Sequence, residues 1–129
     1  MSFLDRLKDS LSVNLPKEWQ ILSSVDQFPM IRELSKEQPV AIFKHSTSCG
    51  VSAMAKYQLE EGWDISQEEL SLFYLDLWKY RPVSNAVAES FGVVHQSPQL
   101  IIIKDGEVAY STSHHGVHLS GLKAKIAQL

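Results

Sequence analysis

Three apolar runs of strand length stand out in the pattern of hydrophobic and polar positions. They are Val40-Ala41-Ile42-Phe43, which continues into Lys44, Leu72-Phe73-Tyr74-Leu75-Asp76-Leu77, and Gln99-Leu100-Ile101-Ile102-Ile103. Each run is short and rich in β-branched or aromatic residues, which predicts strands. The run over 72–77 has too many apolar residues for one exposed face, so we expect a central strand covered on both sides.

Helical patterns separate these strands, with expected ranges 3–11, 26–36, 49–61, 82–91 and 119–127. Asp26 is expected to cap the second of these helices, and Ser48 or Thr47 the third. Pro82 at the start and Gly92 just past the end delimit the fourth, each where that residue type is tolerated best. The first range predicts an N-terminal helical extension over residues 1–15.

A hairpin closes the predicted sheet. Asp105-Gly106 lies between the strand that ends at 103 and a second arm over 107–112, and this dipeptide is a strong hairpin signal. A further edge strand is expected over 19–22. Strands that alternate with helices indicate parallel crossovers, to which the hairpin adds antiparallel strands. We therefore predict one α/β domain over residues 1–129, with a mixed central sheet, helices on both faces, and a C-terminal β-hairpin plus helix.

Composition narrows the class of protein. The chain has 129 residues, of which 44% are hydrophobic and 21% charged, as in an ordinary globular domain. A net charge of −3 gives no reason to expect a nucleic-acid partner, and no apolar run approaches a membrane span. The N-terminus lacks the apolar core of a signal peptide, which predicts a cytoplasmic protein. A single cysteine excludes an internal disulfide, in agreement with a reducing compartment.

That cysteine, Cys49, stands where the first long strand hands over to a helix. A helix N-terminus carries partial positive charge and free N–H groups, which favour a thiolate over a thiol. Three residues on, where a second cysteine would complete a dithiol redox motif, the chain has Ser52. Cys49 is therefore a candidate nucleophile that has no resolving partner in its own chain. The alternative is a small buried hydrophobe, the commoner role of a lone cysteine.

The order of elements resembles the thioredoxin fold from about Trp19 to the C-terminus. Three segments resemble a narrower family, the bacillithiol system redox-active proteins or monothiol bacilliredoxins. They are Phe43-Lys44-His45-Ser46-Thr47-Ser48-Cys49-Gly50-Val51-Ser52, Arg81-Pro82-Val83-Ser84-Asn85 and His95-Gln96-Ser97-Pro98-Gln99, with Ser113-His114 after the hairpin. Gly50 departs from the family, which is expected to have proline after the cysteine.

The resemblance implies roles for particular residues. Cys49 would be the catalytic thiol, and Pro98 would be cis, leaving the Ser97 backbone free to pair with an extended thiol ligand. The residues expected to shape the site or bind the thiol are His45, Gly50, Val51, Ser52, Ser97, Pro98, His114 and His115.

Some of these residues have alternative roles. His45 either contacts the ligand or holds the turn by a hydrogen bond, and Ser52 could donate to the Cys49 thiolate. Asp76 is either a buried proton relay or a solvent-exposed strand end. Trp19, Trp63 and Trp78 are expected to pack in the core or at its rim.

The histidines after the hairpin allow three interpretations. His114, His115 and His118 could bind zinc, but no carboxylate or thiolate stands nearby at a familiar zinc spacing. They could also belong to a loop that merely contains histidines. We favour contact between His114 or His115 and an anionic thiol, and we expect no metal.

Three function classes remain. The first is a monothiol oxidoreductase that removes a low-molecular-weight thiol, bacillithiol by resemblance, from protein mixed disulfides through Cys49. Bacillithiol would be its co-substrate with no bound cofactor, and its partners would be S-thiolated proteins and a regenerating redoxin or reductase. The second is an iron–sulfur carrier, because residues 49–52 differ by one residue from the Cys-Gly-Phe-Ser of monothiol glutaredoxins. The Gly-Gly-x-Asp loop of glutaredoxins is missing, however. The third is a non-catalytic interaction module of thioredoxin type.

Overall fold

A five-stranded mixed sheet forms the centre of the molecule, and the computed structural model describes it within residues 15–129. The strands are β1 (Gln20–Ile21), β2 (Val40–His45), β3 (Ser71–Asp76), β4 (Gln99–Lys104) and β5 (Glu107–Ser113). Their order across the sheet is β1-β3-β2-β4-β5, with β3 parallel to both β1 and β2, and β4 antiparallel to β2 and β5. The predicted mixed sheet is confirmed, and the predicted extension over 1–15 lies almost wholly outside the described residues.

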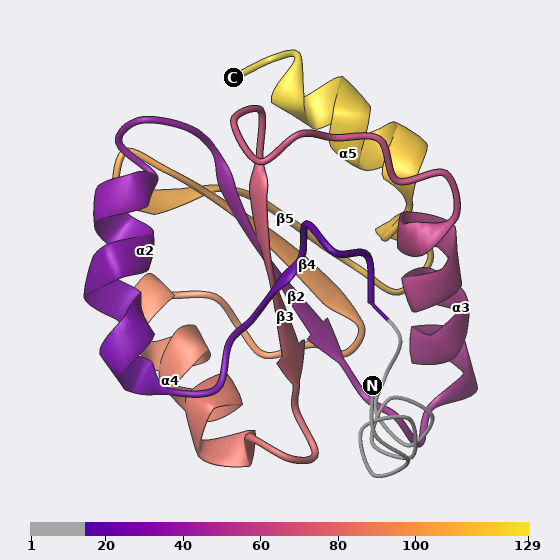
Figure 1. Cartoon of the computed structure of the whole chain (residues 1–129). Helices are drawn as coiled ribbons and strands as arrows, with labels where there is room; N and C mark the ends of the chain where they lie inside the picture. Colours follow the sequence, from indigo (N-terminus) through magenta and orange to yellow (C-terminus); the bar gives the residue numbers. More distant parts are fainter. Residues whose placement is uncertain (1–14) are drawn as a thin grey trace, which may run out of the picture.

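Helices cover both faces of this sheet. On one face lie α2 (Phe28–Leu34) and α4 (Arg81–Phe91), and on the other lie α3 (Gly50–Glu60) and α5 (Leu119–Ile126), as Figure 1 shows. Two short 3₁₀ turns, η1 (Val25–Gln27) and η2 (His114–Gly116), precede α2 and α5. The helix α4 ends at Gly92 in the left-handed conformation (φ 66°), which confirms the predicted stop.

The two faces of the sheet carry separate hydrophobic cores, because side chains alternate along each strand. Under α3 and α5 lie Ala41, Phe43, Leu72, Tyr74, Leu100 and Ile102 with Trp19 and Leu59. Under α2 and α4 lie Val40, Ile42, Phe73, Leu75, Ile101 and Ile103 with Ile31 and Val87. The central strand β3 is buried on both faces, as its continuous apolar run predicted.

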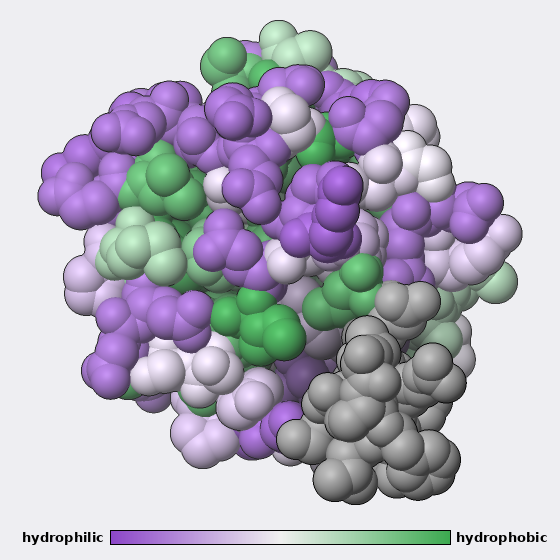
Figure 2. Space-filling model, in the orientation of Figure 1, coloured by the Kyte–Doolittle hydropathy of each residue, from purple (hydrophilic) through white to green (hydrophobic). Residues whose placement is uncertain are grey.

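One face of the molecule shows scattered apolar side chains. On the face seen in Figure 2, hydrophilic residues are spread widely and the hydrophobic ones appear as small separate groups. Isolated apolar side chains of this kind are normal on a protein surface.

Two predicted helix caps are wrong. The turn η1 is capped by Ser24, whose side chain accepts the Asp26 N–H in a capping box with Gln27, so Asp26 lies inside the turn rather than before it. The N-cap of α3 is Cys49 itself, and no side chain caps this helix end. Ser48 and Thr47 lie one and two residues too early for that role, because the chain stays extended through Cys49 (φ −112°, ψ 124°).

The hairpin forms as predicted. Asp105 and Gly106 both have positive φ (55° and 81°), the backbone that a tight two-residue hairpin turn requires. A bulge interrupts the β4–β5 pairing between Ile102 and Ile103.

The sheet topology brings four chain segments to one edge. The parallel strands β2 and β3 both end there, so the segments that follow His45 and Asp76 begin side by side. The antiparallel strand β4 starts at the same edge, where Gln99 pairs with both Lys44 and Ser113. Residues 45–49, 76–81, 95–98 and 113–115 therefore meet at this edge, although they are far apart in the sequence.

Candidate active site

Cys49 is a half-buried thiol at the N-terminus of α3. Its main chain is tied down, since its N–H donates to the Ser46 carbonyl (3.2 Å) and its own carbonyl accepts from Ala53 (2.9 Å). Its side chain makes no capping bond, so the first N–H groups of α3 are available to negative charge on the sulfur. The structure thus places the only thiol of the chain at a helix start where solvent can reach it.

A buried hydrogen-bond clamp holds the turn that carries this cysteine. The Ser52 hydroxyl is wholly buried, lies 2.8 Å from His45 Nδ1 and accepts the Ser46 N–H at 2.9 Å. These bonds join the end of β2, the turn and the first turn of α3. His45 therefore shapes the turn, the second of its two predicted roles. Within residues 15–129 no hydrogen bond reaches the Cys49 sulfur. The Ser52 hydroxyl bonds to His45 and Ser46 and does not make the predicted bond to the Cys49 sulfur.

Burial favours the uncharged form of His45. The residue is 5% exposed, and loss of hydration, with the nearby Lys56 charge, lowers the pKa of His45 below its usual value. Asp76, Ser52 and Glu60 act in the opposite direction and do not overcome these effects. A neutral imidazole can accept a hydrogen bond from the Ser52 hydroxyl at Nδ1, which suits the clamp.

The peptide bond between Ser97 and Pro98 is cis, as predicted. The Pro98 carbonyl accepts the N–H of His114 at 3.0 Å, which ties the start of β4 to the segment after β5. His114 has a left-handed backbone (φ 55°), uncommon for a residue other than glycine. The Ser97 hydroxyl is buried and has no partner within the described residues.

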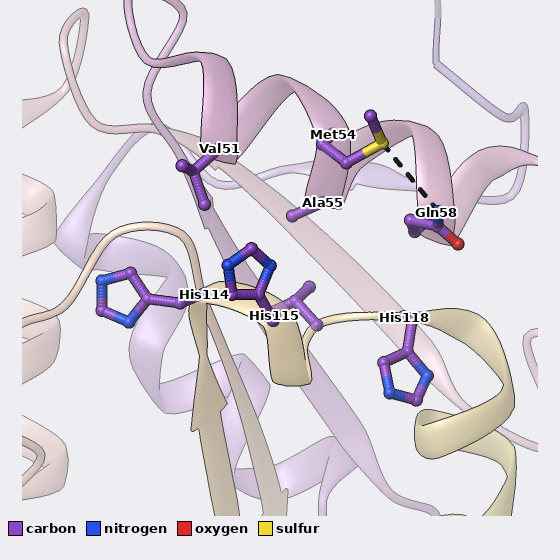
Figure 3. A pocket seen from close by; sticks show the side chains of 8 residues that line it. Val51, Met54, Ala55, Gln58, His114, His115 and His118 are labelled. Carbon is purple, nitrogen blue, oxygen red and sulfur yellow. Dashed lines mark hydrogen bonds between the residues drawn. The ribbon is translucent and has the colours of Figure 1, made fainter.

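A pocket of about 250 Å³ lies between α3 and residues 114–118 (Figure 3). It is lined by Val51, Met54, Ala55, Gln58, His114, His115, Val117 and His118. Val51 is only two residues from Cys49, and the His115 ring points towards α3, whereas the His118 ring is turned towards α5. The pocket therefore lies beside the first turns of α3, close in sequence to Cys49, which does not itself line it.

The histidines form no metal centre in the part of the chain that the structure describes. His118 is the N-cap of α5, and its Nδ1 accepts the N–H of Gly121 at 3.0 Å. That bond uses one imidazole nitrogen in a structural role. His114 and His115 are exposed and are the two histidines whose predicted contact with an anionic thiol remains a prediction.

Sequence reasoning missed a buried lysine at this edge. Lys44 is wholly buried, and its ammonium group donates to the Ser84 carbonyl (3.0 Å) and to His95 Nδ1 (3.1 Å). Burial and the Arg81 charge lower the pKa of Lys44 to about 8. Burial together with Lys44 and Arg81 also lowers the pKa of His95. Because a lysine usually indicates an exposed position, only its place inside an apolar strand gave a signal.

A second missed contact joins the Cys49 turn to the β3–α4 connection. The Trp78 indole N–H donates to the Ser46 hydroxyl at 2.8 Å. Asp76 accepts the N–H groups of Trp78 and Lys79, each at 3.1 Å, so its carboxylate orders this connection. Of the three tryptophans, Trp19 lies in the core, Trp63 packs against it, and Trp78 is largely exposed.

A family comparison identifies the chain. Residues 20–122 match the family model described as monothiol bacilliredoxin BrxC, which is most of the sequence. The chain belongs to the monothiol bacilliredoxin family. The resemblance seen in the three sequence segments is thereby confirmed.

Solved structures confirm the thioredoxin-like fold. A protein given provisionally as an oxidoreductase with a thioredoxin fold is 30% identical, with a TM-score of 0.71 over 85% of this chain and 94% of that one. Thioredoxin from Malassezia sympodialis is 20% identical (TM-score 0.67; 91% and 95% covered). Thioredoxin NaTrxh from Nicotiana alata is 18% identical (TM-score 0.67; 91% and 96% covered). The latter two likenesses concern the fold alone.

As regards membranes, none of the helices within residues 15–129 combines the length and the apolar character needed to cross a bilayer.

Proposed function

We propose that this bacilliredoxin is a cytoplasmic thiol–disulfide oxidoreductase that removes bacillithiol from protein mixed disulfides through Cys49. The observation that carries the proposal is the half-exposed single thiol at the start of α3, with its side chain free of capping bonds. The family match and the adjacent histidine pocket support it.

The reaction would be a thiol–disulfide exchange. The Cys49 thiolate attacks the bacillithiol sulfur of the mixed disulfide, a new S–S bond forms, the old one breaks, and the electron pair leaves on the protein sulfur as a thiolate. No net oxidation occurs, because one disulfide replaces another. A second bacillithiol thiolate, or the thiol of another redoxin, then attacks the Cys49 adduct and releases Cys49 as a thiolate.

The neighbouring groups have separate tasks in this scheme. The clamp of Ser52, His45 and Ser46 holds the turn, so that the sulfur keeps its place at the helix start. Backbone groups of Ser97 beside the cis bond would pair with the extended ligand, and His114 and His115 would contact its anionic groups. Gly50 and Val51 shape the wall next to the sulfur. The bacillithiol itself is a co-substrate, and no bound cofactor is needed.

The test is transfer from a bacillithiolated protein, followed by intact mass. We expect the mass of one bacillithiol to appear on the wild-type chain as the substrate thiol is freed. Cys49→Ser should abolish both changes, while Ser48→Ala, one residue away and exposed, should retain them. A wild type that stays unmodified while the substrate remains capped would refute the proposal.

A further inference from the structure

The connection between β3 and α4 presents aromatic rings and positive charge beside the Cys49 turn. We call residues 78–81, Trp78-Lys79-Tyr80-Arg81, the Trp78 turn. Trp78 is 57% exposed, and Lys79 and Arg81 are exposed as well. The Arg81 guanidinium carbon lies 5.8 Å from the centre of the Trp78 ring, and Lys79 Nζ lies 5.5 Å from that of Tyr80.

The Trp78 turn is fixed relative to the reactive cysteine. The bond from the Trp78 indole to the Ser46 hydroxyl reaches a residue three positions before Cys49. The Leu77 N–H also donates to the His45 carbonyl at 3.0 Å. An exposed tryptophan held by both its main chain and its indole N–H offers a rigid apolar face, with little entropy to lose on contact.

The charge of this region is opposite to that of the whole chain. The protein has a net charge of −3, yet residues 78–81 contain two cations and no acid. The buried Lys44 adds positive charge close to Arg81, as the effect of Arg81 on its pKa shows. The acid that directly precedes the turn in sequence is Asp76, whose carboxylate accepts two N–H groups of the turn. His45 and His95 are held towards their neutral forms and so add little to this charge.

We infer that the Trp78 turn is the docking surface for the protein half of the mixed disulfide, and that it favours substrates with acidic residues next to the thiolated cysteine. The inference rests on the proposed function. Trp, Tyr and Arg are the residue types most often found at the energetic centre of protein interfaces. Positive charge beside the nucleophile would steer acidic substrates towards it and accelerate their encounter.

The experiment compares two synthetic peptides that carry the same bacillithiol mixed disulfide. One has glutamates on both sides of the modified cysteine, and the other has lysines. At low salt we expect the wild type to accept bacillithiol from the glutamate peptide about five- to tenfold faster, as two exposed charge pairs allow. The preference should shrink at high salt, because screening shortens the reach of surface charges.

Charge reversal then assigns the preference to the turn. Lys79→Glu and Arg81→Glu, singly and together, should reduce the preference for the glutamate peptide and then invert it. Lys36→Glu is the matched control. It alters net charge equally, but Lys36 precedes the start of β2, at the opposite edge of the sheet, and should keep the wild-type ratio.

A third substrate, bacillithiol disulfide, has no protein half. The variants should lose far less rate with it than with the glutamate peptide. Equal slowing with this substrate would mean that the turn serves the small thiol, and would overturn the inference. Equal wild-type rates for the two peptides would overturn it as well, while transfer itself would stand. No reaction of the wild type with either peptide would refute the proposed function, and this inference with it.

Discussion

The Ser52 hydroxyl lies 2.8 Å from His45 Nδ1, at the position where a dithiol redoxin would carry its second cysteine. It also accepts the Ser46 N–H and is wholly buried. This residue therefore replaces a resolving thiol with a structural bond that holds the Cys49 turn. The mixed disulfide on Cys49, which a second thiol in the same chain would resolve, must be resolved by another molecule.

Removing the Ser52 hydroxyl should destabilise the protein. Ser52→Ala would leave the Ser46 N–H and His45 Nδ1 without their buried partner, at a cost of about 1–3 kcal/mol in unfolding free energy. Urea denaturation measures this loss, and the transfer rate should fall as the turn loosens. Ser48→Ala removes an exposed hydroxyl with one long contact (3.3 Å to Ser46) and should change stability by less than about 0.5 kcal/mol. Equal stabilities of the two variants would contradict the clamp.

His45 should titrate below the ordinary histidine range. Its folded-state pKa is lowered, so the unfolded chain binds the proton more tightly. The contribution of His45 to stability is then fully present above about pH 6.5 and is lost as pH falls towards the lowered value. NMR titration of the His45 Cε1–H resonance, assigned with His45→Gln, measures the midpoint. A midpoint at or above about 6.5 would exclude this explanation.

Lys44 should make stability increase with pH on the alkaline side. Because burial lowers its pKa from 10.5 to about 8, the unfolded chain holds the proton more tightly between these values. Relative to Lys44→Met, the wild type should gain about 2–3 kcal/mol of unfolding free energy between pH 7 and 10. Because Tyr74 is present in both proteins, its contribution to the pH dependence drops out of this difference. Its raised pKa acts in the opposite direction above about pH 10.

Chemical denaturation across this pH range provides the measurement. Lys36→Met, at an exposed site, serves as the control and should show no comparable change. A constant difference between wild type and Lys44→Met would mean that Lys44 titrates normally in the folded state.

Proline should be tolerated in place of Gly50. Gly50 is the first residue of α3, a position that proline favours, and the extended backbone of Cys49 suits a residue before proline. An added Cβ at Gly50 meets nothing within 4 Å. Gly50→Pro should raise the free energy of unfolding by about 0.4–1 kcal/mol through the unfolded state, and should retain transfer to Cys49.

Gly50→Ala separates the two effects of that substitution, since it adds a Cβ without fixing φ. It should give a smaller gain by the same route. A loss of stability in Gly50→Pro alone would show that the glycine N–H or its backbone freedom is needed at the start of α3.

Much of the fold could be read from local sequence. The runs at 40–43, 72–77 and 99–103 predicted buried strands because their apolar character is continuous. Gly92 predicted a helix end, and the pair Asp105-Gly106 predicted a hairpin. Both predictions succeeded because few residues adopt positive φ without strain. The helix caps were predicted less well, since neighbouring polar residues such as Ser24 and Asp26 compete for the same role and only the backbone decides between them.

The sequence by itself determined that Cys49 is the only thiol and that it follows a strand into a helix. Tertiary structure decided which side chains surround it. His45 and Ser52 meet inside one turn, Trp78 reaches Ser46 from 32 residues away, and Lys44 finds its partners on α4 and the loop after it. These contacts depend on the order and direction of the strands, which bring distant loops to one edge of the sheet. Hydrophobic periodicity predicts which face of a strand or helix a residue lies on, but not which other segment of the chain it contacts there.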